Sequence, residues 1–166
     1  MKNSELEKFL DLNTDHYFKK TKRIILKNKD MQVTYAVFMR RPVLFCPSLA
    51  IKWLRKIEKI RNTKFNIKMC YKEGEWVGAG EPLMFLSGKF SQLVELETTY
   101  LQLIGPASVA AYNAFKMCTD LPNTAFMAMD ARHCAGAHMH ELMAYGASVG
   151  SNKAQKELNA KGFIGS

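Results

Sequence analysis

The residues from Asp130 to His133 place an acid, a cation and an imidazole within four positions. They follow the apolar run 124–129, which has the composition of a buried parallel strand. Ligands of α/β proteins bind at the carboxyl ends of such strands, and an arginine can hold a carboxylate or phosphate through two parallel hydrogen bonds. The pattern therefore predicts a ligand site at Arg132. The alternative is a salt bridge between Asp130 and Arg132 that closes a loop.

A second group of residues, Asp15, His16 and Tyr17, stands at the start of a predicted helix. A helix N-terminus offers free backbone N–H groups to an anion, and Tyr17 offers an aromatic face. The alternative is structural, with Asp15 as an N-cap and Tyr17 in the core, because aspartate is a preferred cap. Both interpretations stay open on the residues alone.

A third group, Cys134, His138 and Glu141, has the i, i+4, i+7 spacing of one helical face and consists of possible zinc ligands. A metal needs converging ligands, and the sequence has no second Cys/His cluster to supply the others. We therefore predict no metal site. The stretch 146–157 carries glycines and a lysine but lacks the residue order of a phosphate-binding P-loop.

The helices and strands that must position these residues can be predicted from the periodicity of apolar residues and from capping and turn residues. Alternation of apolar and polar residues with strong β-formers predicts strands, and a 3.6-residue period with capping residues predicts helices. The first half is predicted to form a helix over about 13–26, a strand over 31–41, a helix over 47–60, a strand over 65–71 and short strands with tight turns over 73–90.

The second half is predicted to be mainly helical and to end as an α/β unit. Gly105 and Pro106 are expected to separate two helices, and Gly150 is expected to stop a third. The predicted elements are helices over 92–104 and 107–117, a buried strand over 124–130, a helix from 134 or 136 to 147, a polar helix over 152–161 and the start of a buried strand over 162–166.

Composition limits the class of protein. The chain has 166 residues, 48% of them hydrophobic, and contains no run that could cross a membrane and no export signal. Its four cysteines form no CxxC pair, so we expect reduced thiols in the cytoplasm. Basic residues concentrate in 1–72, where eighteen Lys and Arg face six Asp and Glu. That half could attract RNA, a membrane surface or a polyphosphorylated substrate, although the helix over 47–60 also fits an ordinary solvated cationic face.

Five segments in order resemble the N-terminal part of nicotinate phosphoribosyltransferases, members of the type II phosphoribosyltransferase family: NTDHYF, EGEWVGAGEPLMFLSG, ELETTYLQLIGPASVAA, FMAMDARHCAG and SVGSNKAQKELNAKGFIGS. The resemblance implies an α+β N-terminal domain over 1–122, then over 123–166 the first strand-helix units of an atypical (β/α) barrel. It implies NAD salvage by pentosyl transfer, from nicotinate and phosphoribosyl pyrophosphate to nicotinate mononucleotide and pyrophosphate, with Mg²⁺ and ATP. It also implies a homodimer with its active sites between the subunits, and makes membrane or nucleic-acid partners unexpected.

The resemblance also implies roles for individual residues. Asp15 and Tyr17 match a substrate-binding motif in which the tyrosine lies against the pyridine ring of the neighbouring subunit's site. Arg132 and His133 match a basic pair with catalytic and substrate-binding roles, although most relatives have arginine where this chain has His133. Glu97 matches a helix-borne glutamate with a structural role.

Length argues against catalysis by these residues alone. A (β/α)₈ barrel takes roughly 250 residues, far more than follow residue 122. We therefore expect a fragment or truncated product that is inactive alone. The alternative is a non-catalytic remnant or a small polyanion-binding protein.

Overall fold

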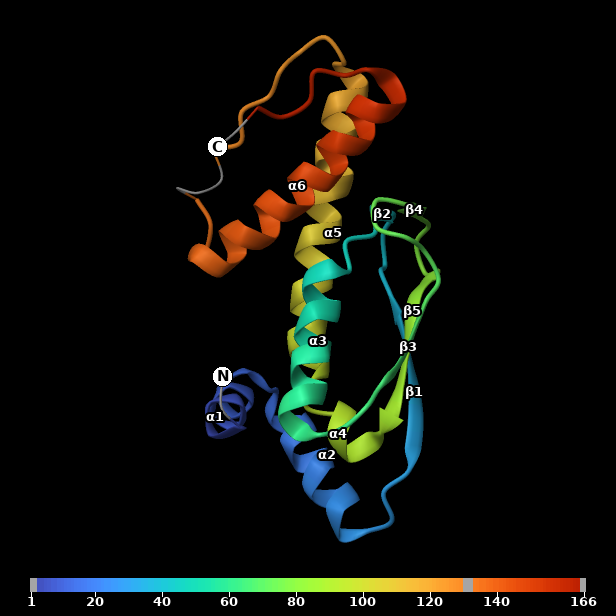
Figure 1. Cartoon of the computed structure of the whole chain (residues 1–166), viewed down its shortest axis with the longest axis vertical. Helices are drawn as coiled ribbons and strands as arrows, with labels where there is room; N and C mark the ends of the chain where they lie inside the picture. The colour runs from blue at the N-terminus through green and yellow to red at the C-terminus, as the bar shows by residue number, and fades with distance from the viewer. Residues whose placement is uncertain (1–2, 130–132, 165–166) are drawn as a thin grey trace.

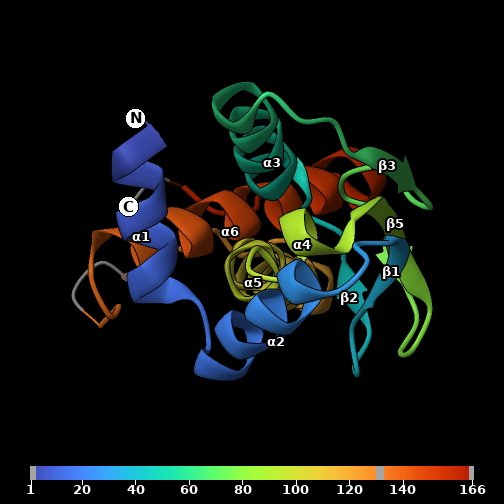
Figure 2. The ribbon, with the colours of Figure 1, turned by 90° about the horizontal axis from the view of Figure 1, so that it is seen from below.

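The computed structural model describes residues 3–129 and 133–164. Its longest helix, α5 (Glu97–Asp120), runs along the long axis of the molecule (Figure 1). Viewed along that axis, α2 (His16–Lys27), α3 (Ser48–Arg61), α6 (Ala137–Leu158) and the sheet surround α5 (Figure 2). The chain is a mixed α/β structure.

A three-stranded antiparallel sheet packs beside α5. Its order is β1 (Gln32–Phe38), β5 (Pro82–Lys89), β3 (Asn66–Met69), so the strand that comes last in sequence is central. The register pairs Tyr35 with Leu86 and Ile67 with the same Leu86. A second sheet pairs β2 (Val43–Leu44) with β4 (Trp76–Val77). The strands predicted from alternation over 31–41 and 65–71 are confirmed.

The main core lies between the sheet, α3 and α5. Leu54 and Ile57 from α3, and Leu83 and Leu86 from β5, are fully buried there. Two further buried residues, Leu6 and Leu10, come from α1 (Asn3–Asn13), an element that the sequence analysis did not predict. The short α4 (Phe90–Leu93) connects β5 to the segment before α5.

The two helices predicted on either side of Gly105 and Pro106 are one helix, so that prediction is wrong. Proline lacks the N–H that would bond the carbonyl four residues earlier, at Gln102, and its ring crowds the same carbonyl. Gln102 is exposed, while Ala107 and Ala111 on the same helix are fully buried against α6. Packing therefore outweighs one lost hydrogen bond.

The predicted stop at Gly150 is also wrong, because α6 continues to Leu158. A Cβ on Gly146 would lie 2.2 Å from the carbonyl oxygen of Ala107, and one on Gly150 would lie 2.0 Å from that of Ala111. Both glycines therefore let α6 approach the backbone of α5. The small side chains of Ala107 and Ala111 on α5 lie at the same close contact.

In the segments predicted as buried strands over 124–130 and 162–166, the described residues 124–129 and 162–164 make one isolated parallel bridge, between Phe126 and Phe163. The prediction of burial is wrong for most of the first segment, since Met127 and Met129 are exposed. The two phenylalanine rings stack at 5.5 Å and pack near Cys118 and Ala154. One bridge does not establish a barrel, and the division at residue 122 stays a prediction.

Candidate functional site

The side chains of Thr14 and Asp15 fasten the start of α2 to the residues around the start of α5. The hydroxyl of Thr14 donates a hydrogen bond of 3.0 Å to the carbonyl of Glu95, and Thr14 is buried. Asp15 occupies the N-cap position but makes no side-chain cap bond. Its carboxylate instead accepts a 3.2 Å hydrogen bond from the hydroxyl of Thr98. These bonds fix where α2 begins.

A buried ion cluster holds Glu95 itself. Lys22 on α2 donates to the Glu95 carboxylate at 2.6 Å, and Arg61 at the end of α3 pairs with the same oxygen. The side chains of Glu95 and Arg61 are only 10% and 8% exposed. Arg61 also contacts Glu7 at 3.0 Å. The cluster joins α1, α2 and α3 at the point where Thr14 is anchored.

Tyr17 projects from this anchored start. It is 59% exposed, which makes the alternative of a core tyrosine wrong. Its ring lies 4.0 Å from the ring of Phe18, and Phe18 faces the interior. Partial desolvation raises the pKa of the Tyr17 hydroxyl, and the carboxylates of Asp15 and Glu97 add to the effect. Tyr17 therefore presents a neutral aromatic surface to solvent.

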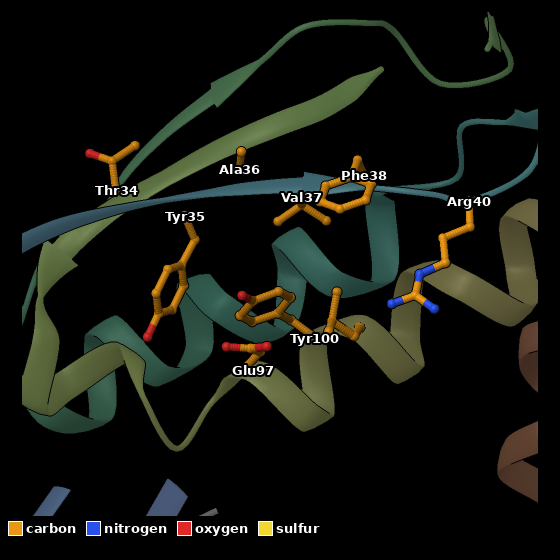
Figure 3. A pocket seen from close by; sticks show the side chains of 9 residues that line it. Thr34, Tyr35, Ala36, Val37, Phe38, Arg40, Glu97 and Tyr100 are labelled. Carbon is orange, nitrogen blue, oxygen red and sulfur yellow. The ribbon is translucent and has the colours of Figure 1, made fainter. Parts of the chain in front are cut away.

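A pocket of about 430 Å³ lies between β1 and α5. In Figure 3 the side chains of Tyr35, Glu97 and Tyr100 point toward one another, and Arg40 lies at the other end of the pocket. The remaining lining residues are Thr34, Ala36, Val37, Phe38 and Leu101. The pocket thus combines two phenol groups, a carboxyl group and a guanidinium.

Burial governs the protonation of this pocket. It raises the pKa of Tyr35 to about 12, with the nearby Glu97 carboxylate adding to the shift. Burial also raises the pKa of Tyr100 and that of Glu97, and Asp15 contributes at Glu97. Both phenols are therefore neutral hydrogen-bonding groups near pH 7. They can orient a polar ligand but supply no strong base.

Sequence reasoning missed this pocket, although two signals pointed toward it. Tyr35 and Val37 alternate along a strand, so they share one face. Glu97 and Tyr100 are three residues apart on a helix and share another. What the sequence does not show is that these two faces oppose each other. Glu97 was assigned a structural role, but it lines the pocket.

The second predicted site is described only in part. Arg132 and Asp130 lie outside the described residues, so neither the ligand role of Arg132 nor its alternative salt bridge is tested. His133 is exposed in the turn that precedes α6. Figure 1 shows the start of α6 well separated from α2 along the long axis. No hydrogen bond among the described residues joins His133 to Asp15 or Tyr17.

The described donor sets do not fit a metal. Within residues 3–129 and 133–164, no three His, Cys, Asp or Glu side chains are grouped to hold an ion, and Cys134, His138 and Glu141 form no such group. These residues therefore do not build a magnesium site, and no step through Mg²⁺ or ATP is derived from them. In the same ranges, no helix combines the length and apolar character needed to cross a bilayer.

The match to a family model covers residues 15–108 and identifies them as the quinolinate phosphoribosyl transferase N-terminal domain. It begins at Asp15, takes in the anchored start of α2 and the pocket, and spans more than half of the chain. The chain belongs to this family of type II phosphoribosyltransferases. A search of curated protein sequences found no match.

Several solved structures share the fold at low sequence identity. Human nicotinic acid phosphoribosyltransferase aligns with a TM-score of 0.67 and 20% identity, covering 92% of this chain and 38% of its own. The nicotinate-nucleotide pyrophosphorylase of Ehrlichia chaffeensis aligns with a TM-score of 0.66 and 16% identity, over 89% and 52%. That of Francisella tularensis aligns with a TM-score of 0.60 and 15% identity, over 94% and 54%. The chain thus spans about half, or less, of each of these proteins.

Proposed function

We propose that the chain is part of a phosphoribosyltransferase of NAD biosynthesis and that it presents Tyr17 to the pyridine substrate. The observation that carries the proposal is the exposed ring of Tyr17 on a helix start that Thr14 and Asp15 anchor to α5. The matched family domain contains this segment, and the solved relatives are named for nicotinate and its nucleotide. We favour nicotinate as the pyridine substrate because the sequence motifs resemble those of nicotinate phosphoribosyltransferases.

In the proposed reaction, the pyridine nitrogen attacks the anomeric carbon of phosphoribosyl pyrophosphate. A C–N bond forms as the C–O bond to pyrophosphate breaks, and pyrophosphate leaves with the bonding electrons. Tyr17 would contribute by stacking on the ring and orienting its nitrogen, because orientation lowers the barrier to a two-substrate reaction. Arg132 would meet the nicotinate carboxylate or the donor's phosphates.

The separation of Tyr17 from His133 supports a site shared between two copies of the chain. In that arrangement, Asp15 positions Tyr17 through Thr98 and is not itself a substrate contact. We further propose that these 166 residues do not catalyse the reaction alone, because the residues after 122 are far fewer than the roughly 250 of a (β/α)₈ barrel.

The test compares Tyr17→Ala, Tyr17→Phe and the matched control Trp76→Ala, which removes another exposed aromatic ring. Saturation-transfer NMR with nicotinate measures contact with the pyridine protons. We expect Tyr17→Ala to weaken the signal roughly tenfold, since stacking on an aromatic side chain is worth about 1–3 kcal/mol. Tyr17→Phe and Trp76→Ala should keep the signal. Equal signals from Tyr17→Ala and the unmodified chain would refute the stacking role.

Catalysis is tested separately by incubating the chain with nicotinate, phosphoribosyl pyrophosphate, ATP and magnesium. We expect no nicotinate mononucleotide by chromatography. Turnover that disappears in Tyr17→Ala would support the stacking role and overturn the claim of inactivity. A parallel incubation with quinolinate identifies the pyridine if turnover occurs.

One observation favours a second candidate, a polyanion-binding protein. Lys52, Lys56 and Lys59 are exposed on α3, and no ion pair involves them in the part of the chain that the structure describes. Retention on heparin that moderate salt abolishes, and that Lys52→Glu weakens, would support this candidate.

A further inference from the structure

The β3 strand leaves one edge of its backbone unpaired. It is the last strand of the sheet and pairs only with β5. The N–H of Cys70 donates a hydrogen bond of 3.0 Å to the carbonyl of Leu83. This bond shows which residues of the strand direct their backbone groups toward β5 and which direct them away. Even-numbered residues of β3 direct their N–H and C=O groups toward β5, so those of Ile67 and Met69 point away from the sheet.

At Phe65, the residue just before β3, the outward backbone groups have hydrogen-bond partners. The outward N–H of Phe65 donates to the Glu58 carboxylate at 2.6 Å, and Arg55 donates to the carbonyl of Phe65 at 3.5 Å. Side chains of α3 therefore close the edge at Phe65. No hydrogen bond among the described residues closes it at Ile67 or Met69.

Space for a further strand lies beside those two residues. A groove of about 440 Å³ runs between β3 and α3, lined by apolar Ile51, Ile67 and Met69 and bordered by Lys52 and Arg55. Pro47 and Ser48 complete it. Figure 2 shows β3 at the side of the sheet next to α3. An extended peptide uses both features, since its backbone pairs with an edge while alternate side chains enter a groove.

The exposed lysines around the groove indicate which kind of ligand it would bind. Besides the three lysines on α3, Lys64 and Lys68 are exposed, and neither takes part in an ion pair among the described residues. Edge pairing of two copies of this chain would bring these lysines against each other, and such lysines commonly protect edges from self-association. Nucleic acid has no peptide backbone to complete the edge. The combination fits an extended, acidic protein segment.

We propose that the β3 edge and its groove bind an extended segment of a partner protein by strand addition. Apolar side chains at every second position of the segment enter the groove, and an acidic residue pairs with Lys52. The segment's backbone meets the outward groups of Ile67 and Met69. This surface is separate from Tyr17 and the pocket, so the proposal does not depend on the phosphoribosyltransferase role.

The test uses the full 166-residue chain and a fluorescently labelled eight-residue peptide of alternating Val and Glu with blocked ends. Binding is followed by fluorescence anisotropy. Met69→Pro removes one outward N–H without touching the bonds to β5, and Lys52→Glu reverses one charge. We expect each to weaken binding about tenfold or more, because each removes one element of edge recognition. Lys20→Glu, an equal charge change on exposed α2, should weaken it less than about twofold.

A second measurement covers the case in which Met69→Pro unfolds the chain. Amide hydrogen exchange of the unmodified protein should slow at Ile67 and Met69 when the peptide is added. A peptide of the same composition with its glutamates grouped should bind more weakly than the alternating one. The proposal is overturned if the alternating peptide does not bind, if both peptides or heparin bind equally well, or if the two amides exchange unchanged.

Discussion

Replacing Gly146 by alanine tests the contact between α5 and α6 most directly. The added Cβ would lie 2.2 Å from the carbonyl oxygen of Ala107 and 2.9 Å from the Cβ of Ala110. Real Cβ atoms essentially never come closer than 3.0 Å to another heavy atom, so the two helices must separate by nearly 1 Å at this point. The opposing atom belongs to a helix backbone, so rotation of a flexible side chain cannot relieve the clash.

The expected magnitude combines two opposing effects. Overpacking of a tight contact costs about 1–3 kcal/mol, and the rigid backbone here places the cost near the upper end. Alanine recovers up to about 1 kcal/mol of helix propensity over glycine. The net loss is therefore about 2 kcal/mol in the free energy of unfolding, or roughly 4–8 °C in Tm for a chain of this size.

The assay is urea unfolding followed by circular dichroism, with Gly105→Ala as the matched control. Gly105 is also inside a helix, but an added Cβ there would meet only the Met39 methyl group at 4.0 Å. That variant should gain about 0.5–1 kcal/mol from propensity alone. If Gly146→Ala is as stable as Gly105→Ala, the glycine does not serve the helix contact and the explanation of the uninterrupted α6 fails.

Two other predictions concern charge. Glu95→Ala should destabilise the fold by about 3–5 kcal/mol, because it removes the buried one of the two carboxylates that pair with Arg61, whereas Glu7→Ala, which removes the half-exposed one, should cost less than about 1 kcal/mol. Thermal unfolding compares the two, and equal losses would contradict the assigned roles. Tyr35 should titrate near pH 12, and its ionisation in the unfolded chain should lower stability as the pH rises from 10 toward 12. Absorbance at alkaline pH, compared with Tyr35→Phe, measures this, and a Tyr35 pKa near 10 would contradict it.

Elements with a strong local period were predictable. The strands β1 and β3 alternate in sequence, and α3 shows an apolar stripe opposite lysines, so local pattern determined their type. The wrong helix boundaries were predicted at residue types that occur both at helix ends and inside helices. Gly150 can end a helix or allow a neighbour close, and only the position of α5 decides between them. Pro106 likewise can end a helix or lie inside one, and the sequence around it does not show that packing keeps α5 continuous.

The candidate site also has one part that the sequence indicates and one part that depends on long-range packing. Tyr17 could be selected as a candidate because the motif beginning at Thr14 is contiguous in sequence, but the residues alone did not decide between an exposed and a buried ring. The pocket was not predictable, because Tyr35 and Glu97 lie on different elements far apart in the chain. The anchoring of Thr14 on Glu95 depends on a comparable long-range contact. Local sequence indicates which residues are chemically useful, while tertiary packing determines which of them meet.

The central position of β5 governs when the sheet can form during synthesis. Gln32 at the start of β1 pairs with Lys89 at the end of β5, and β3 pairs with β5 as well. The ribosome therefore releases both outer strands before either has its partner, because β5 begins at Pro82, after β3 has ended at Met69. Contacts of such sequence separation slow folding, because loop closure precedes any gain from pairing. Until β5 emerges, the nascent chain carries two unpaired strands, which makes this interval its main period of exposure to aggregation.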